Sequence, residues 1–144
     1  MMNGEKPRQR RGGCRCGAIR YLAEGDPLWV AHCHCESCRR ATGTALVTYA
    51  GYARDRVSFT AGRPTEYASS PGVTRSFCGT CGTPLAYAGA RWPEEIHLLL
   101  CTLDDPESLE PRGHVYTAER LRWLKLDDGL PRYPGSASEG DPEG

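Results

Sequence analysis

The chain has 144 residues, with 18 basic and 18 acidic side chains, so its formal net charge is zero. This balance argues against a nucleic-acid binder, which carries an excess of basic residues. No apolar run approaches the ~20 residues of a membrane span, and the basic start lacks the apolar stretch of a secretory signal. The sequence therefore predicts a cytoplasmic protein of about one domain, since ~100–200 residues per domain is usual.

Turn-forming residues divide the chain into short segments rich in aromatic and β-branched residues, which is typical of β-strands. Strands are expected, in chain order, at residues 18–23, 28–34, 45–52, 56–60, 65–69, 73–77, 85–88 and 95–103. One helical turn is expected at 36–41, before Gly43 stops it. Segment 118–126 is ambiguous, but Trp123 and Leu124 are expected to pack on the core. The pattern favours a mainly β fold with antiparallel pairing.

The two ends of the chain differ from the middle in composition. Residues 1–11 are polar and basic, residues 135–144 are polar and acidic, and both stretches are expected to be disordered. Residues 12–134 are expected to form the folded domain.

The eight cysteines need a role other than disulfide formation, because cytosolic thiols stay reduced. They form three tight groups and leave one residue alone. The groups are Cys14 with Cys16, Cys33 with Cys35 and Cys38, and Cys78 with Cys81, and the single residue is Cys101. Such spacing suits chelation of one ion better than bridges between distant strands. We therefore predict that the grouped cysteines bind metal.

The Cys78-x-x-Cys81 pair lies in the segment FCGTCGTP, which is typical of a zinc knuckle, since its glycines allow a tight turn. One knuckle supplies two ligands, whereas a closed structural zinc site needs four. Cys14 and Cys16, two residues apart, project from one face if they lie on a strand. The two pairs together predict a four-thiolate site that stabilises the fold.

Cys33, Cys35 and Cys38 remain as a separate group, and three protein ligands with an open position are the pattern of a catalytic zinc site. A fourth protein ligand would instead close the site and leave it structural. The candidates for this ligand are Cys101, His32, His34 and Glu36. Spacing alone leaves both alternatives open. Arg39 and Arg40 follow directly, and they are expected to offset the charge of three thiolates or to hold an anionic substrate.

Taken in order, these motifs resemble the glutathione-dependent formaldehyde-activating enzyme family, which also includes the domain of centromere protein V. The matching segments are GCRCGA at 13–18, HCHCESCRR at 32–40, FCGTCGT at 77–83, TLDDP at 102–106, PRGHV at 111–115, Trp123, and DGLP at 128–131. A single CxxC motif is weak evidence, whereas this ordered set is highly specific. The resemblance covers the domain predicted at residues 12–134.

The resemblance implies a β-tent fold of short antiparallel strands held together by zinc, with two zinc ions per chain. It implies a structural zinc on Cys14, Cys16, Cys78 and Cys81. It implies a second zinc on Cys33, Cys35 and Cys38, with an exchangeable fourth position. Thiolate ligands suit zinc and iron alike, and the resemblance selects zinc. It also implies that glutathione and formaldehyde are the thiol and the aldehyde, with S-hydroxymethylglutathione as their adduct.

The leading hypothesis is a zinc-dependent carbon–sulfur lyase-like enzyme with Cys33, Cys35 and Cys38 as its catalytic residues. A metal-bound thiol deprotonates, its thiolate adds to the aldehyde carbonyl, and the reverse reaction cleaves the adduct. His32 or His34 would shuttle the proton, or would have only a structural role. The alternative hypothesis is a non-catalytic thiol carrier or protein-binding module that zinc stabilises. Neither hypothesis involves nucleic acid or a membrane.

Overall fold

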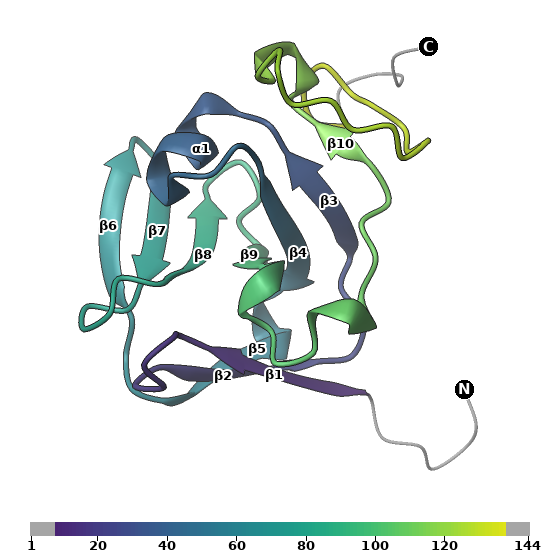
Figure 1. Cartoon of the computed structure of the whole chain (residues 1–144). Coiled ribbons are helices and arrows are strands. Elements are labelled where there is room, and N and C mark those ends of the chain that lie inside the picture. Colours follow the sequence, from purple (N-terminus) through teal and green to yellow (C-terminus); the bar gives the residue numbers. More distant parts are fainter. Residues whose placement is uncertain (1–7, 138–144) are drawn as a thin grey trace. The chain divides into compact units, whose positions relative to one another are not determined.

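The computed structural model (Figure 1) describes residues 8–137. These residues form two compact units. The first unit contains residues 8–28 and 50–108, and the second contains residues 29–49 and 109–137. Strands outnumber helices among residues 8–137, which confirms the predicted mainly β fold. Within the described residues, no helix has the length and apolar character that crossing a bilayer requires.

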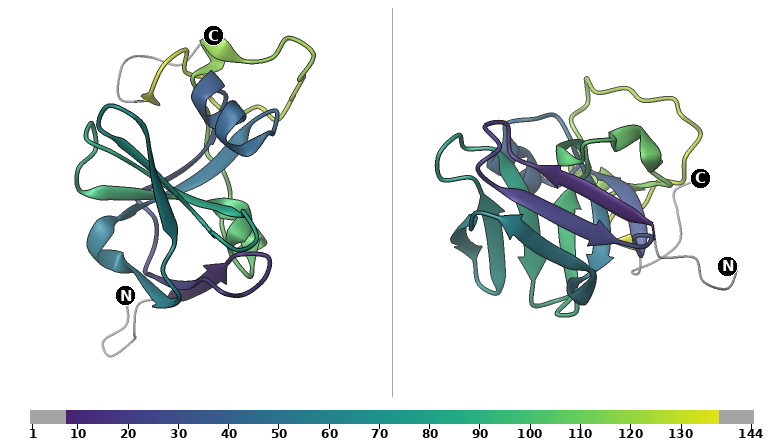
Figure 2. Two further views of the ribbon diagram at one scale, coloured as in Figure 1. Left: turned by 90° about the vertical axis from the view of Figure 1, so that its left-hand side faces the viewer. Right: turned by 90° about the horizontal axis from the view of Figure 1, so that it is seen from below.

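The first unit contains a three-stranded antiparallel sheet in the order β1-β2-β5. Its strands are β1 (Gln9–Gly13), β2 (Arg20–Glu24) and β5 (Val57–Ala61). The purple strands β1 and β2 run side by side in the right-hand view of Figure 2. Tyr21 and Ala23, at alternate positions of β2, are buried, as expected for a strand with one face on the core.

Strand β1 begins inside the stretch 1–11, for which the sequence predicts disorder. The Arg10 side chain is buried, and its guanidinium donates to the Gly25 carbonyl at 2.9 Å and to Ser108 Oγ at 3.1 Å. Arginines in polar segments are normally exposed to water. Burial of the Arg10 charge requires hydrogen-bond partners, and these lie far away in the sequence, so the local sequence did not reveal it. Residues 1–7, the rest of that predicted disordered stretch, lie outside the described residues.

A second antiparallel group in the first unit has the strand order β9-β8-β7-β6. The bounds are β6 (Thr65–Ser70), β7 (Val73–Phe77), β8 (Pro84–Gly89) and β9 (Glu95–Leu99). Three short 3₁₀ helices complete the unit: η1 (Arg54–Arg56), η2 (Leu100–Thr102) and η3 (Pro106–Ser108). Strand β9 ends before η2, so the strand predicted at 95–103 is shorter than expected. As a result Cys101 lies in η2 and not in a strand, and it is exposed.

The second unit contains β3 (Trp29–Cys33), α1 (Glu36–Thr42), the start of β4 (Val47–Ala53), β10 (His114–Val115) and η4 (Thr117–Glu119). Residues 50–53 of β4 belong to the first unit. Helix α1 ends at Gly43, whose φ of 71° gives the left-handed cap that the sequence predicts. Strand β10 pairs with β3 in parallel, which corrects the expectation of antiparallel pairs only. Two residues are too few to give the alternation that reveals a strand.

The segment after η4 also differs from expectation. Trp123 is 69% exposed, so the prediction that it packs on the core is wrong. Leu121, Leu124 and Leu126 on either side of it are half-buried. At the predicted disordered tail 135–144, Ser136 is buried and the Gly135 carbonyl accepts a hydrogen bond from the Tyr116 N–H at 2.9 Å. Residues 138–144 of this tail lie outside the described residues.

The ionisation of Tyr21 is expected to make the free energy of unfolding depend on pH in alkaline solution. Its hydroxyl lies 2.7 Å from Thr102 Oγ1, and burial raises the pKa of Tyr21 to about 12. An unfolded tyrosine has a pKa of about 10, so between these values the unfolded state releases a proton that the folded state retains. The contribution of Tyr21 to the free energy of unfolding is therefore fully present below about pH 10. Between about pH 10 and the folded pKa of about 12 it falls by about 1.4 kcal/mol per pH unit.

Urea unfolding at pH 8, 10 and 11 measures this loss for the wild type and for Tyr21→Phe, which cannot ionise. The wild type should lose about 1 kcal/mol more than the variant between pH 10 and 11. Equal losses in the two proteins would show that Tyr21 is not the group responsible.

Candidate metal centres

Four cysteine sulfurs meet in the first unit, from the turn after β1 and the turn between β7 and β8. The Sγ atoms of Cys14, Cys16, Cys78 and Cys81 all lie within 4.8 Å of one another. Cys16 Sγ lies 3.6 Å from Cys14 Sγ and 3.8 Å from Cys78 Sγ. A disulfide bond is about 2.05 Å long, whereas four sulfurs held about 2.3 Å from a central zinc are about 3.8 Å apart. The sulfur positions therefore fit a tetrahedral zinc site and exclude disulfides in this structure.

Turns bring these sulfurs together. Strand β1 ends at Gly13, so Cys14 and Cys16 lie at a turn and not on a strand, and they do not project from one strand face. In the second turn, the Gly82 N–H donates to the Cys78 carbonyl at 2.8 Å, and Gly82 has a φ of 81°. This left-handed conformation favours glycine, as the predicted knuckle requires.

Hydrogen-bond donors stabilise the thiolate form of Cys14 and Cys81. The Ala18 N–H does the same for Cys16, but the neighbouring sulfurs, that of Cys14 foremost, together with burial outweigh it, and the pKa of Cys16 rises to about 11. The Ile19 N–H donates to Cys14 Sγ at 3.2 Å, and the Cys81 N–H donates to Cys78 Sγ at 3.4 Å. The hydroxyl of Thr83, 3.1 Å away, together with backbone N–H groups lowers the pKa of Cys81 to about 5. Since the thiolate is the form that binds metal, the surroundings of these cysteines suit ligands of a cation.

A separate group of three cysteine sulfurs lies in the second unit. The Sγ atoms of Cys33, Cys35 and Cys38 lie within 4.8 Å of one another, and those of Cys33 and Cys38 are 3.7 Å apart. Cys33 ends β3, and Figure 1 shows α1 beginning directly after this strand. Cys35 caps α1, and its Sγ accepts a hydrogen bond from the Cys38 N–H at 3.2 Å. The cap of α1 brings Cys35 to the other two cysteines.

The chemistry of the three-cysteine group also suits a cation. Cys33 and Cys38 are buried, Cys35 is partly exposed, and the Tyr49 hydroxyl donates to Cys38 Sγ at 3.2 Å. Hydrogen bonding to Cys35 and Cys38, together with burial, raises the pKa of Cys33, because adjacent thiolates repel one another. A divalent cation would compensate this repulsion, so the residues fit a zinc ion.

No fourth histidine, cysteine, aspartate or glutamate of residues 8–137 joins this three-cysteine group within the same distance. Of the predicted fourth ligands, Cys101 belongs to no such group, and Glu36 accepts a hydrogen bond from Arg40 Nε at 3.4 Å. Arg39 donates to the carbonyls of His34 at 3.3 Å and Glu119 at 3.1 Å. The anion-binding role expected of the two arginines stays a prediction.

A chain of hydrogen bonds beside β3 and β10 joins residues for which the sequence predicts no shared role. His34 Nε2 lies 2.8 Å from His114 Nδ1, and His114 Nε2 lies 2.7 Å from Asp128 Oδ2. An ionised carboxylate accepts only, so His114 Nε2 carries a proton and, when His114 is neutral, its Nδ1 accepts from His34 Nε2–H. The sequence signals were a histidine in PRGHV and an aspartate in DGLP, which nothing in the spacing brings together.

His32 lies beside this chain. Its Nδ1 is 2.7 Å from Thr48 Oγ1, and its ring centroid is 4.9 Å from that of His114. His32, His114 and Asp128 thus form a third group of potential ligand atoms. The hydrogen bonds of His32 and His34 to neighbouring side chains favour a structural role for both histidines over a proton shuttle.

Comparison with known proteins agrees with these motifs. The family described as glutathione-dependent formaldehyde-activating enzyme matches residues 9–119. A Halomonas elongata protein, whose name includes the same enzyme description, is 28% identical over 126 residues, which cover 81% of this chain and 80% of that protein. An uncharacterized lyase of Schizosaccharomyces pombe is 34% identical over 77 residues, which cover 54% of this chain and 56% of the yeast protein.

A solved structure extends the comparison to the fold. The crystal structure of a Rhodobacter sphaeroides protein matches with a TM-score of 0.57 at 25% sequence identity. The match covers 71% of this chain and 92% of the bacterial one. The family match spans most of the chain and includes all seven clustered cysteines. The chain therefore belongs to the glutathione-dependent formaldehyde-activating enzyme family.

Proposed function

We propose that the protein is a zinc-dependent carbon–sulfur lyase-like enzyme that forms or cleaves a thiol–aldehyde adduct such as S-hydroxymethylglutathione. The observation that supports it is the group of Cys33, Cys35 and Cys38, three thiol ligands of which Cys35 is partly exposed. Family membership supports glutathione as the thiol and formaldehyde as the aldehyde.

The two cysteine groups would have different roles. Cys14, Cys16, Cys78 and Cys81 would hold a structural zinc with four protein ligands. Cys33, Cys35 and Cys38 would hold the second zinc. Zinc held by these three cysteines would supply a Lewis acid that lowers the pKa of a thiol ligand.

The surrounding residues hold this second site in place. The Cys38 N–H and the Tyr49 hydroxyl donate to ligand sulfurs, which stabilises their negative charge and fixes their orientation. In the forward reaction a carbon–sulfur bond forms, the carbonyl π bond breaks, and the thiol proton ends on the new hydroxyl. Cleavage reverses each change, so the same site serves both directions.

Metal analysis combined with glutathione calorimetry on anaerobic protein tests the proposal. The wild type should contain two zinc ions per chain and bind glutathione. Cys35→Ser should contain one zinc ion and bind glutathione at least about tenfold more weakly than the wild type, because two thiolates hold zinc poorly. Cys101→Ser is the matched control, since this exposed cysteine belongs to neither group.

Exchange of formaldehyde with its glutathione adduct, followed by NMR, then separates an enzyme from a carrier. Acceleration by the wild type and not by Cys35→Ser is expected. Glutathione binding without acceleration would favour the alternative, a non-catalytic thiol carrier. Two zinc ions without any glutathione binding would overturn the glutathione-dependent reaction and leave a zinc-stabilised binding module.

A further inference from the structure

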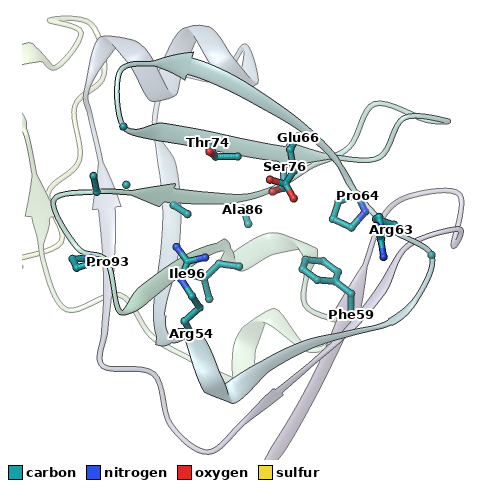
Figure 3. Close-up of a pocket in the computed structure, with 15 residues that line it drawn as sticks. Arg54, Phe59, Arg63, Pro64, Glu66, Thr74, Ser76, Ala86, Pro93 and Ile96 are labelled. Atoms are coloured by element: carbon teal, nitrogen blue, oxygen red, sulfur yellow. The ribbon is translucent and has the colours of Figure 1, made fainter.

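The first unit contains a cavity of about 640 Å³ between β5 and the group of strands β6 to β9 (Figure 3). Sites for small molecules usually measure ~300–1,000 Å³. Thr74 and Ser76 of β7 line it and pair with Ala88 and Ala86 of β8, so one face of this sheet carries small side chains. Facing sheets normally fill the space between them with large apolar residues. Here the sequence leaves that space free, and we call it the inter-sheet groove.

Three charged side chains line the inter-sheet groove: Arg54 of η1, Arg63 of the β5–β6 loop and Glu66 of β6. Figure 3 shows Arg54 on the side of Ile96 and Arg63 on the opposite side, with Phe59 between them. All three charged residues are exposed. Within residues 8–137, none of their side chains has a hydrogen-bond or ion-pair partner.

The charges of the groove define the ligand that complements it. A free guanidinium pairs with a carboxylate through two parallel hydrogen bonds, so two separated arginines suit a molecule with a carboxylate at each end. The Glu66 carboxylate suits one ammonium group. The hydroxyls of Thr74 and Ser76 offer hydrogen bonds to amide groups between those ends.

We infer that the inter-sheet groove binds a short peptide that carries two carboxylates and one ammonium group. Glutathione is a peptide with this set of charges, and its choice as the ligand rests on the proposed function. The groove recognises the charged ends of the peptide, and its binding requires neither zinc nor a free thiol.

S-methylglutathione is the probe that tests this inference, because its sulfur has no proton to lose and the charged groups are unchanged. Calorimetry of the zinc-loaded full chain should show binding to the wild type. Arg54→Gln and Arg63→Gln should each weaken it roughly 10- to 100-fold, as expected for loss of a charge-assisted hydrogen bond. Arg56→Gln is the matched control, since Arg56 is an exposed arginine of η1 that does not line the groove.

The outcomes separate this inference from the proposed function. Cys35→Ser should bind S-methylglutathione as the wild type does. Absence of binding to the wild type, or equal weakening by Arg56→Gln, would overturn the groove inference even if glutathione still bound at the three-cysteine site. Binding that depends on Arg54 and Arg63, without acceleration of the formaldehyde exchange, would support the groove and reject the enzyme.

Discussion

Cys78→Ser is expected to lose one zinc ion and, with it, the cooperative folding of the first unit. Cys78 is 1% exposed, and its sulfur accepts N–H groups of its own turn and lies 3.8 Å from Cys16 Sγ. A zinc held there connects two turns that are far apart in the sequence. Structural zinc contributes about 10–16 kcal/mol in small zinc-binding peptides, as much as the whole net stability of about 5–15 kcal/mol of a domain.

Metal content and thermal unfolding by circular dichroism measure this loss. Cys101→Ser, which changes an exposed cysteine outside both groups, should keep both zinc ions and change stability by no more than about 0.5 kcal/mol. A Cys78→Ser protein that melts like the wild type would show that the four-cysteine group does not stabilise the fold. Loss of both zinc ions in this variant would show that the two sites do not fill independently.

His114→Ala is expected to destabilise the second unit by about 4 kcal/mol, because it combines a buried cavity with broken hydrogen bonds. The His114 side chain is fully buried and contacts His34 at 2.8 Å and Asp128 at 2.7 Å. Its removal leaves His34 Nε2 without its partner, and His34 Nδ1 already has none among the described residues. Denaturant unfolding of the wild type and of His114→Ala, fitted with the same dependence of free energy on denaturant concentration, gives the difference in their free energies of unfolding.

Two milder variants make this prediction specific. Asp128→Asn keeps an acceptor oxygen but removes the charge, and it should cost about 1–2 kcal/mol. Asp127→Asn, at the exposed neighbouring position, should cost less than about 0.5 kcal/mol. Equal costs for Asp127→Asn and Asp128→Asn would contradict a specific contribution from the hydrogen-bonded chain.

Patterns in the sequence predicted those strands and helix ends that depend only on neighbouring residues. The β-branched and aromatic residues at 73–77, next to turn-forming residues, predicted β7 with its observed bounds, and Gly43 marked the end of α1. Strand β10 has two residues and exists because its partner is β3, so no local signal could reveal it. Arg10 is similar, since its burial depends on Ser108, which lies 98 residues away.

The cysteine groups were predictable because coordination chemistry restricts which cysteines can combine. A closed zinc site needs four ligands, so the knuckle at Cys78 and Cys81 required a second pair, and the structure brings Cys14 and Cys16 to it. The chain of His34, His114 and Asp128 follows no such rule. His34 and His114 are 80 residues apart. A hydrogen-bonded chain has no fixed number of members, unlike a zinc site, so the sequence does not indicate that a partner is missing.

The sequence separation of the ligands also orders their assembly during synthesis. Cys33 and Cys38 are five residues apart, so the three-cysteine group is available almost as soon as α1 leaves the ribosome. Cys16 and Cys78 are separated by 62 residues, which take about 3–12 seconds to translate at ~5–20 residues per second. During that interval Cys14 and Cys16 form a dithiol on an incomplete chain, exposed to oxidants and to competing metals. A cell that makes this protein must therefore keep its thiols reduced until the knuckle has been translated.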